Sequence, residues 1–395
     1  MFRERVKGFF NIEGSSPNWF WHSILFPFLL TRTIWELIAY YAYGNYQPNP
    51  TYEKLFQRGY FLTRIFPLDI FARWDSKWYL SVIKTGYQAS TDLKTAYSNM
   101  AFFPLYPYLV KSLGWSGLVL PDGFYILVGL ILSNLCFLGS MVVLYHLIIV
   151  SLGFDESAAQ RTLTLLFVYP ASFFFSAFYP ESLFFFLVLL SFTFALDEKW
   201  LLTGICAALA VLARPQGVVL VPALGWLYME KREWKLREIR ASAAWLLLAP
   251  LALLLHFYEL YLYSGHIFAF FDALNAWGGL QAGILQNPLQ NLQGPALDVY
   301  KIDLVLSALF LTCSLYLLWK WPLKAYGLFA ILMCILPLAT GLLVSISREF
   351  LVVFPVFILL GEKLKRREVY IALLAVWFAL QIIYFAGWVN YYWIA

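Results

Sequence analysis

Long apolar blocks, separated by short polar segments and charged clusters, make up most of the chain. Blocks such as 246–263, 304–319 and 371–384 approach the ~20 residues that a helix needs to cross the hydrocarbon core of a bilayer. The pattern predicts an all-α polytopic membrane protein with about eleven transmembrane helices, folded as a single domain over 1–395. The predicted spans are 19–43, 123–150, 158–176, 182–196, 201–213, 218–229, 241–263, 303–319, 325–344, 351–361 and 370–388.

The basic residues orient these spans, because cytoplasmic loops of membrane proteins carry an excess of Lys and Arg. Basic residues at 3–7 precede the first block, and the run KREWKLREIR at 231–240 is the strongest cytoplasmic marker. Two long polar segments, 44–122 and 264–302, then fall on the extracytoplasmic side. We expect a multi-pass protein of the plasma (inner) membrane of a bacterium, since the compact chain shows no targeting signal.

The composition argues against a soluble domain, a nucleic-acid-binding protein and a protein with disulfides or a cysteine metal site. Of the 395 residues, 62% are hydrophobic and only 13% charged, whereas a soluble domain carries about 25% charged residues. The net charge of +5 does not indicate a nucleic-acid partner, because the basic residues stand at the ends of apolar blocks. The four cysteines lie inside apolar blocks, which predicts buried side chains without a disulfide or a metal site.

One stretch of the first long polar segment combines an acid, two cations and aromatic rings. It reads Arg73, Trp74, Asp75, Ser76, Lys77, Trp78 and Tyr79. One interpretation is an interfacial anchor, in which Trp and Tyr mark the membrane surface and Asp75 forms a solvated ion pair. The other makes Asp75 the general base for an acceptor hydroxyl, with cations that hold a phosphate and rings that pack on a sugar.

Three further polar positions fall on the same side of the predicted membrane. Arg214 lies at the tip of an apolar hairpin, where a charge needs an anionic partner, and Glu181 lies in the neighbouring turn FYPES. Arg348 is followed directly by Glu349. Structural ion pairs and a helix N-terminus would explain all of these residues, and so would a site in which Arg214, Arg348 and Glu181 bind substrate.

The sequence offers little for a cofactor. Asp69 and Asp92 share a segment with Asp75, which is a weak indication of a metal-binding pair. The four histidines have no ligand spacing, and neither a glycine-rich phosphate loop nor a zinc motif is found. We therefore expect no cofactor and no metal, although a divalent ion stays open.

Five motifs in order give the chain a resemblance to the PIG-V family of mannosyltransferases. They are RWDSKWYLSVIKTGY (73–87), AFFPLYP (101–107), YPASFFFSAFYPESLFFFL (169–187), ARPQG (213–217) and SREFLVVFPVF (347–357). Two positions depart from the common family pattern. Tyr169 stands where the family commonly has Asn before Pro-Ala-Ser, and Glu349 stands where it commonly has Tyr after Arg.

The resemblance implies a GT-C type glycosyltransferase fold, with juxtamembrane helices in the long first extracytoplasmic loop. It also implies a polyprenyl- or dolichyl-phosphate sugar donor, usually of mannose, and a glycolipid or glycan acceptor. The catalytic acid of the family lies in the first loop, and Asp75 matches that position. A single acid without a covalent intermediate then predicts an inverting transfer.

Two other classes of protein remain open from the sequence. A transporter or flippase of lipid-linked sugars would also bury charges near broken helices, but it would show matching interrupted helices in two halves. A subunit without catalysis would tolerate the loss of Asp75.

Overall fold

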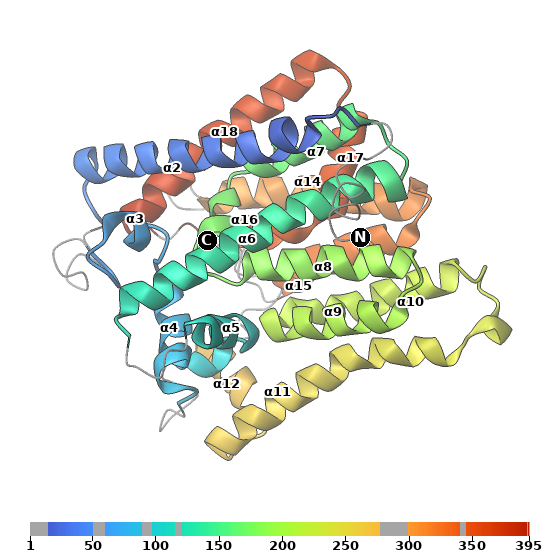
Figure 1. The fold of residues 1–395 in the computed structure, drawn as a ribbon, viewed down its shortest axis with the longest axis horizontal. Helices are drawn as coiled ribbons and strands as arrows, with labels where there is room; N and C mark the ends of the chain where they lie inside the picture. Colours follow the sequence, from blue (N-terminus) through green and yellow to red (C-terminus); the bar gives the residue numbers. More distant parts are fainter. Residues whose placement is uncertain are drawn as a thin grey trace.

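The computed structural model describes residues 15–49, 60–88, 97–114, 120–276, 299–339, 345–392 and 394. These parts of the chain are helical and contain no strand. Long helices run side by side through the molecule, and short helices gather at one of its ends (Figure 1). These short helices are α3 (Phe66–Asp69), α4 (Ser76–Thr85), α5 (Leu105–Leu113) and α12 (Ala269–Ala276). The predicted all-α architecture is confirmed.

The long and medium-length helices follow the apolar blocks of the sequence. They are α2 (Phe26–Asn45), α6 (Asp122–His146), α7 (Glu156–Val168), α8 (Glu181–Leu196), α9 (Trp200–Ala213), α10 (Leu220–Glu230), α11 (Leu248–Ser264), α14 (Val299–Lys320), α15 (Lys324–Ala339), α17 (Phe354–Lys363) and α18 (Arg367–Val389). In the described residues, five helical segments are long and apolar enough to cross a membrane. The full count of about eleven passes stays a prediction.

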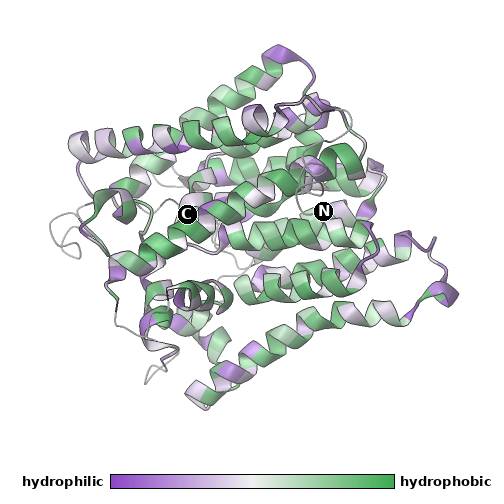
Figure 2. Cartoon of the chain, in the orientation of Figure 1, coloured by the Kyte–Doolittle hydropathy of each residue, from purple (hydrophilic) through white to green (hydrophobic). Residues whose placement is uncertain are grey.

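Hydropathy is arranged along these helices as a bilayer requires. Apolar residues fill the middle of the bundle, and hydrophilic residues collect at its two ends (Figure 2). The short helices α3, α4, α5 and α12 all belong to the two segments predicted as extracytoplasmic loops. Which side of the membrane they occupy stays a prediction.

One predicted helix is wrong over its second half. The apolar block 158–176 predicts one continuous helix, but α7 ends at Val168. Tyr169 adopts φ −57° and ψ 140°, because a residue before proline is pushed out of the helical region by the ring of Pro170. A short 3₁₀ turn, Ser172–Ser176, follows, and the chain then reaches the start of α8.

A buried glutamine satisfies the backbone at this break. A helix that ends inside the protein leaves carbonyl groups without partners. The side chain of Gln381, from α18, is fully buried and its Nε2 donates to the carbonyl oxygens of Phe167 and Tyr169, at 3.0 Å each. The amide thereby fixes the segment that leads to Tyr179 and Glu181.

Close packing of α15 against α14 gives a test of this bundle. A Cβ added at Gly327 would collide with the backbone of Leu318, so we expect Gly327→Ala to destabilise the protein by about 1–3 kcal/mol through overpacking. Gly225, in α10, has no atom near the place of a Cβ. Gly225→Ala should therefore be neutral or stabilise by up to about 1 kcal/mol, because Ala favours a helix over Gly.

Thermal unfolding of both variants in detergent measures the difference. Equal midpoints for Gly327→Ala and Gly225→Ala would contradict the packing of α15 on α14.

Candidate active site

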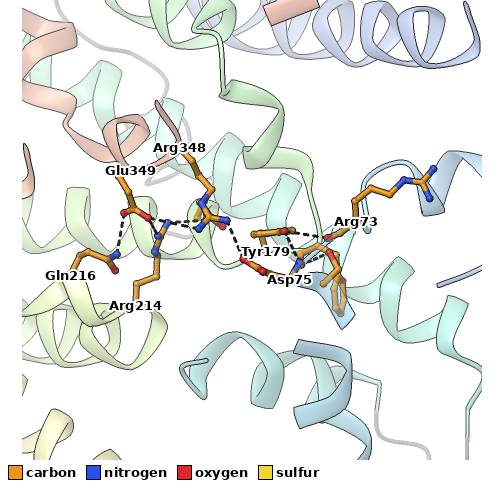
Figure 3. Close-up of polar contacts among 10 residues, drawn as sticks. Arg73, Asp75, Tyr179, Arg214, Gln216, Arg348 and Glu349 are labelled. Atoms are coloured by element: carbon orange, nitrogen blue, oxygen red, sulfur yellow. Dashed lines mark hydrogen bonds and ion pairs between the residues drawn. The ribbon is translucent and has the colours of Figure 1, made fainter. Parts of the chain in front are cut away.

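Four segments that are distant in sequence meet at one end of the bundle. They are the residues before α4, the turn before α8, the turn after α9, and α16 (Ile346–Glu349). Figure 3 shows the side chains of Asp75, Tyr179, Arg214 and Arg348 together in this region. The four polar positions that the sequence assigned to one side of the membrane thus come together in the fold.

Tyr179 holds the backbone of the segment that carries Asp75. The backbone N–H of Asp75 donates to the Tyr179 hydroxyl at 2.9 Å, and that hydroxyl lies 3.1 Å from the carbonyl oxygen of Arg73, to which it donates. Between them Trp74 has φ +52°, a left-handed conformation that is unfavourable for a bulky residue. Such strain persists only where the surroundings impose it, and it is concentrated at functional sites.

The carboxylate of Asp75 is not used to cap the helix that follows it. Aspartate at an N-cap usually accepts a hydrogen bond from the first turn, with its own backbone extended. Asp75 is helical instead, with φ −64° and ψ −15°, and its side chain makes no capping bond. Its Oδ2 lies 3.3 Å from Nη1 of Arg348. The carboxylate is therefore not committed to the helix that follows it.

Arg348 also belongs to a buried network of two arginines and two glutamates. Nη1 of Arg214 lies 2.8 Å from Oε1 of Glu181, and Nη2 of Arg214 pairs with Oε1 of Glu349. Nε of Arg348 lies 3.5 Å from the same Glu181 oxygen. Gln216 Nε2 donates to Oε2 of Glu349 at 3.1 Å. The contacts of Glu349 with Arg214 and Gln216 can be followed in Figure 3.

The charges of this cluster compensate one another in a region with little water. Burial alone would lower the pKa of Arg348, but Glu181, Asp75 and Glu349 more than offset it and raise the pKa above its ordinary value. Burial would also lower the pKa of Arg214, but Glu349 and Glu181 raise it above its ordinary value. Both guanidinium groups are therefore firmly charged.

Accessibility separates an inner pair from an outer pair. The side chain of Glu181 is 1% exposed and that of Arg214 8%, whereas Arg348 and Asp75 are 13% and 14% exposed. Asp75 and Arg348 are therefore the more accessible of the two pairs.

Arg73 and Lys77 do not join this network, although the sequence proposed both as phosphate ligands. Arg73 is completely buried, pairs with Asp69 and donates to the hydroxyl of Tyr391. Its guanidinium points away from the carboxylate of Asp75 (Figure 3). Lys77 is exposed, with its Nζ 5.0 Å from the ring centre of Trp78.

The aromatic residues of the motif are largely used for packing. The ring of Trp78 stacks on Phe102, with centres 6.0 Å apart. Tyr79 is buried and meets Tyr179 edge to face, and burial raises the pKa of its hydroxyl. Trp74, which is half buried, stands next to Asp75 with the left-handed backbone described above.

Asp69 has a structural role that the sequence did not reveal. Its carboxylate accepts hydrogen bonds from the backbone N–H groups of Phe61, Leu62 and Thr63, besides its pair with Arg73. Asp92, the other acid considered for a metal pair, lies outside the described residues. Among the described residues, no group of three His, Cys, Asp or Glu could hold a metal ion.

Sequence reasoning missed Tyr179 and Gln216, and it treated Glu349 as a neighbour of Arg348 and as a departure from the family pattern, not as a partner of Arg214. The signal for Tyr179 and Gln216 was their place in the motifs FYPES and ARPQG, next to residues that were proposed. The role of Glu349 depends on its contact with Arg214, which no local pattern indicates.

Comparison with known proteins identifies the family. The sequence model of the family Mannosyltransferase (PIG-V) matches residues 64–264, just over half of the chain. The chain belongs to this family. It is thus a member of a family of membrane glycosyltransferases. No curated protein matches it. Asp75, Glu181 and Arg214 lie within the matched part of this PIG-V protein, and Arg348 lies beyond it.

Two of the solved structures similar to this chain come from Archaeoglobus fulgidus. The apo oligosaccharyltransferase is 15% identical, with 92% of this chain and 56% of that chain covered and a TM-score of 0.45. The oligosaccharyltransferase AglB with an inhibitory peptide and a dolichol-phosphate is 13% identical, with 92% and 55% covered and a TM-score of 0.43.

This chain spans about half the length of those proteins. At these TM-scores the likeness carries no argument. The GT-C architecture therefore stays an expectation from the motifs.

The position of Arg214 between two carboxylates leads to a stability prediction. Arg214→Met removes the closest cation from the buried carboxylates of Glu181 and Glu349 and leaves them only the longer contacts to Arg348, so we expect a loss of about 3–5 kcal/mol in the free energy of unfolding. Arg214→Lys should lose less, because an ammonium can still pair with one carboxylate.

Arg232→Met is the matched control. Arg232 is similarly buried, but its acidic partner Glu198 is 52% exposed, so the carboxylate that is set free stays hydrated. Denaturant unfolding in detergent measures all three variants. A loss for Arg214→Met no larger than that for Arg232→Met would contradict the charge compensation described here.

Proposed function

We propose that this PIG-V family protein transfers mannose from a polyprenyl-phosphate donor to a hydroxyl of a glycolipid or glycan acceptor. The transfer takes place at the extracytoplasmic face and inverts the anomeric centre. The observation that carries the proposal is the carboxylate of Asp75, which has no capping role and pairs with Arg348 at the accessible edge of a buried charge cluster.

Asp75 is the general base in this proposal. The acceptor O–H gives its proton to the Asp75 carboxylate while its oxygen forms a bond to the anomeric carbon of the donor. The bond from that carbon to the phosphate oxygen breaks, and its electron pair leaves with polyprenyl phosphate. A base must lie within hydrogen-bond reach of the proton that it takes. The clamp of Tyr179 on the neighbouring backbone holds Asp75 in one place for this step.

Arg348 is the residue proposed to bind the donor phosphate. It lies next to Asp75, is charged, and is more accessible than Arg214. A guanidinium forms two parallel hydrogen bonds with a phosphate, which places positive charge where the leaving group develops negative charge. The phosphate would compete with Asp75 for Arg348. Donor binding would thereby release the carboxylate to act as a base.

Arg214 and Glu181 then have supporting roles. Arg214 is already paired with Glu181 and Glu349. Glu181 also contacts Arg348. Glu181 would orient the guanidinium of Arg348 toward the donor, and Arg214 would hold Glu181. The proposed step uses arginine rather than a metal ion to stabilise the phosphate.

The role of Asp75 predicts a large fall in the rate of transfer when the carboxylate is replaced by a group of nearly the same shape. Asp75→Asn removes the base, so we expect the rate of transfer to fall on the order of 10²–10⁴-fold. Donor affinity should be kept or increase, because Arg348 loses its competing carboxylate. Radiolabelled polyprenyl-phosphate mannose, incubated with purified protein and membrane lipid extract, measures both quantities.

Asp122→Asn is the control for Asp75→Asn. Asp122 forms a solvent-exposed pair with Lys84 close to the same end of the bundle, and exposed pairs contribute little. Transfer by Asp75→Asn at the wild-type rate would show that the base lies elsewhere. A wild-type protein that moves the lipid across vesicles without any transfer would support a flippase instead.

The role of Arg348 predicts weaker binding of the phosphate. We expect kcat/KM of Arg348→Gln to fall on the order of 10²–10³-fold, as for other groups that stabilise developing charge. Arg348→Lys should recover part of it, since a point charge replaces a bidentate fork. Inhibition by the product, polyprenyl phosphate, reports phosphate binding directly and should weaken in parallel. An unchanged inhibition constant in Arg348→Gln would rule out this arginine as the phosphate ligand.

A further inference from the structure

A hollow lies at the opposite end of α4 from Asp75. It is open, has a volume of about 550 Å³, and is lined by Gly86, Tyr108, Lys111, Ser112 and Tyr263. Since α4 has ten residues and rises 1.5 Å per residue, the hollow begins about 15 Å from Asp75. None of its lining residues belongs to the charge cluster described above.

Two helices face each other across this hollow. Tyr108, Lys111 and Ser112 follow one another at helical spacing on α5, and Tyr263 stands at the end of α11. Gly86 ends α4 with φ +72°, a conformation that glycine adopts without strain, and its site for a Cβ is open space. The surface of the hollow at Gly86 is therefore formed by backbone atoms.

The tyrosines of the hollow are held in place from behind. The hydroxyl of Tyr108 donates to Oε1 of Glu259, and Oε2 of Glu259 lies 3.1 Å from Nδ1 of the buried His256. The ring of Tyr87 lies between the two walls, with its centre 6.4 Å from that of Tyr108 and 6.0 Å from that of Tyr263. A preorganised aromatic surface of this kind loses little entropy when a ligand binds.

The groups that remain open to a ligand suit a carbohydrate. Tyr263 is 51% exposed and Tyr108 38%, so both residues are open to a ligand, while the hydroxyl of Tyr108 is already paired with Glu259. Lys111 is exposed and forms no ion pair with a described residue, so its ammonium can donate to hydroxyl oxygens. Burial, together with Glu259, raises the pKa of Tyr108, so its phenol stays protonated.

We infer that this hollow binds sugar residues of the acceptor, at a distance from the hydroxyl that receives mannose. The inference rests on the proposed function and adds to it the substrate class. The acceptor is a glycan of several sugar rings, long enough to reach from Asp75 to the far end of α4. Tyrosine and lysine side chains also anchor proteins at membrane surfaces, but an anchor does not need a concave wall in which Glu259, backed by His256, holds the ring of Tyr108.

Acceptors of different length test the inference. Methyl α-mannoside is too short to reach the hollow from Asp75, whereas α-linked manno-oligosaccharides of increasing length eventually do so. For Tyr263→Ala and Lys111→Ala we expect about a tenfold rise in KM for the long acceptors, the loss of one good ring or charge contact. KM for methyl α-mannoside and for the donor should not change.

Tyr258→Ala is the matched control. Tyr258 is a similarly exposed tyrosine of α11 that does not line the hollow, so its substitution should leave every KM unchanged. Ser112→Trp, which fills the hollow instead of emptying it, should raise KM for the long acceptors as well.

The outcomes separate this inference from the proposed function. Wild-type transfer with the same KM for long acceptors in all three hollow variants would overturn the inference alone. The same holds if the variants only change how the protein partitions into membranes, which would assign the hollow to the lipid interface.

Absence of transfer by the wild type to any acceptor would overturn the proposed function instead. The hollow is then tested by saturation-transfer NMR with the long manno-oligosaccharide. Binding to the wild type that is lost in Tyr263→Ala supports the site, and equal or no binding refutes it.

Discussion

The site depends on one interaction, the burial of Arg214 between Glu181 and Glu349. These groups come from the turn after α9, the first residue of α8 and the last residue of α16. Removing several charges from water is expensive, and the cost is offset only when each charge finds a partner. The three elements must therefore come together in one arrangement, and that arrangement places Arg348 next to Asp75.

Backbone breaks at the same end of the bundle make this arrangement possible. Pro170 ends α7 early, Gln381 satisfies the carbonyl groups left behind, and the chain turns through buried residues to Tyr179 and Glu181. Irregular backbone at such a depth is tolerated in a membrane protein only where protein or a polar cavity surrounds it. The break therefore belongs to the construction of the site.

The cluster divides its charged groups between two tasks. The inner groups, Arg214, Glu181 and Glu349, satisfy one another and hold the geometry. Asp75 and Arg348 stand at the more accessible edge, with a contact of 3.3 Å. In the proposed mechanism this outer pair does the chemistry, and the strained backbone at Trp74, clamped by Tyr179, keeps the acid in position.

By itself the sequence determined most of the long helices and their approximate ends, with the block 158–176 as an exception, because α7 ends at Val168. Apolar blocks form helices in a bilayer whatever their neighbours do, because the backbone must satisfy its own hydrogen bonds there. The motifs were also sufficient to single out Asp75, Glu181, Arg214 and Arg348, since charges inside an apolar chain are conspicuous.

Only the tertiary structure decided which of these charges meet. Arg73 is two residues from Asp75 along the chain, yet it is buried against Asp69 and Tyr391, whereas Arg348 is brought to Asp75 from 273 positions away. The left-handed backbone of Trp74 and the clamp of Tyr179 belong to contacts between distant segments. Local pattern carries no information about such contacts, because their energy depends on the burial that the whole fold creates.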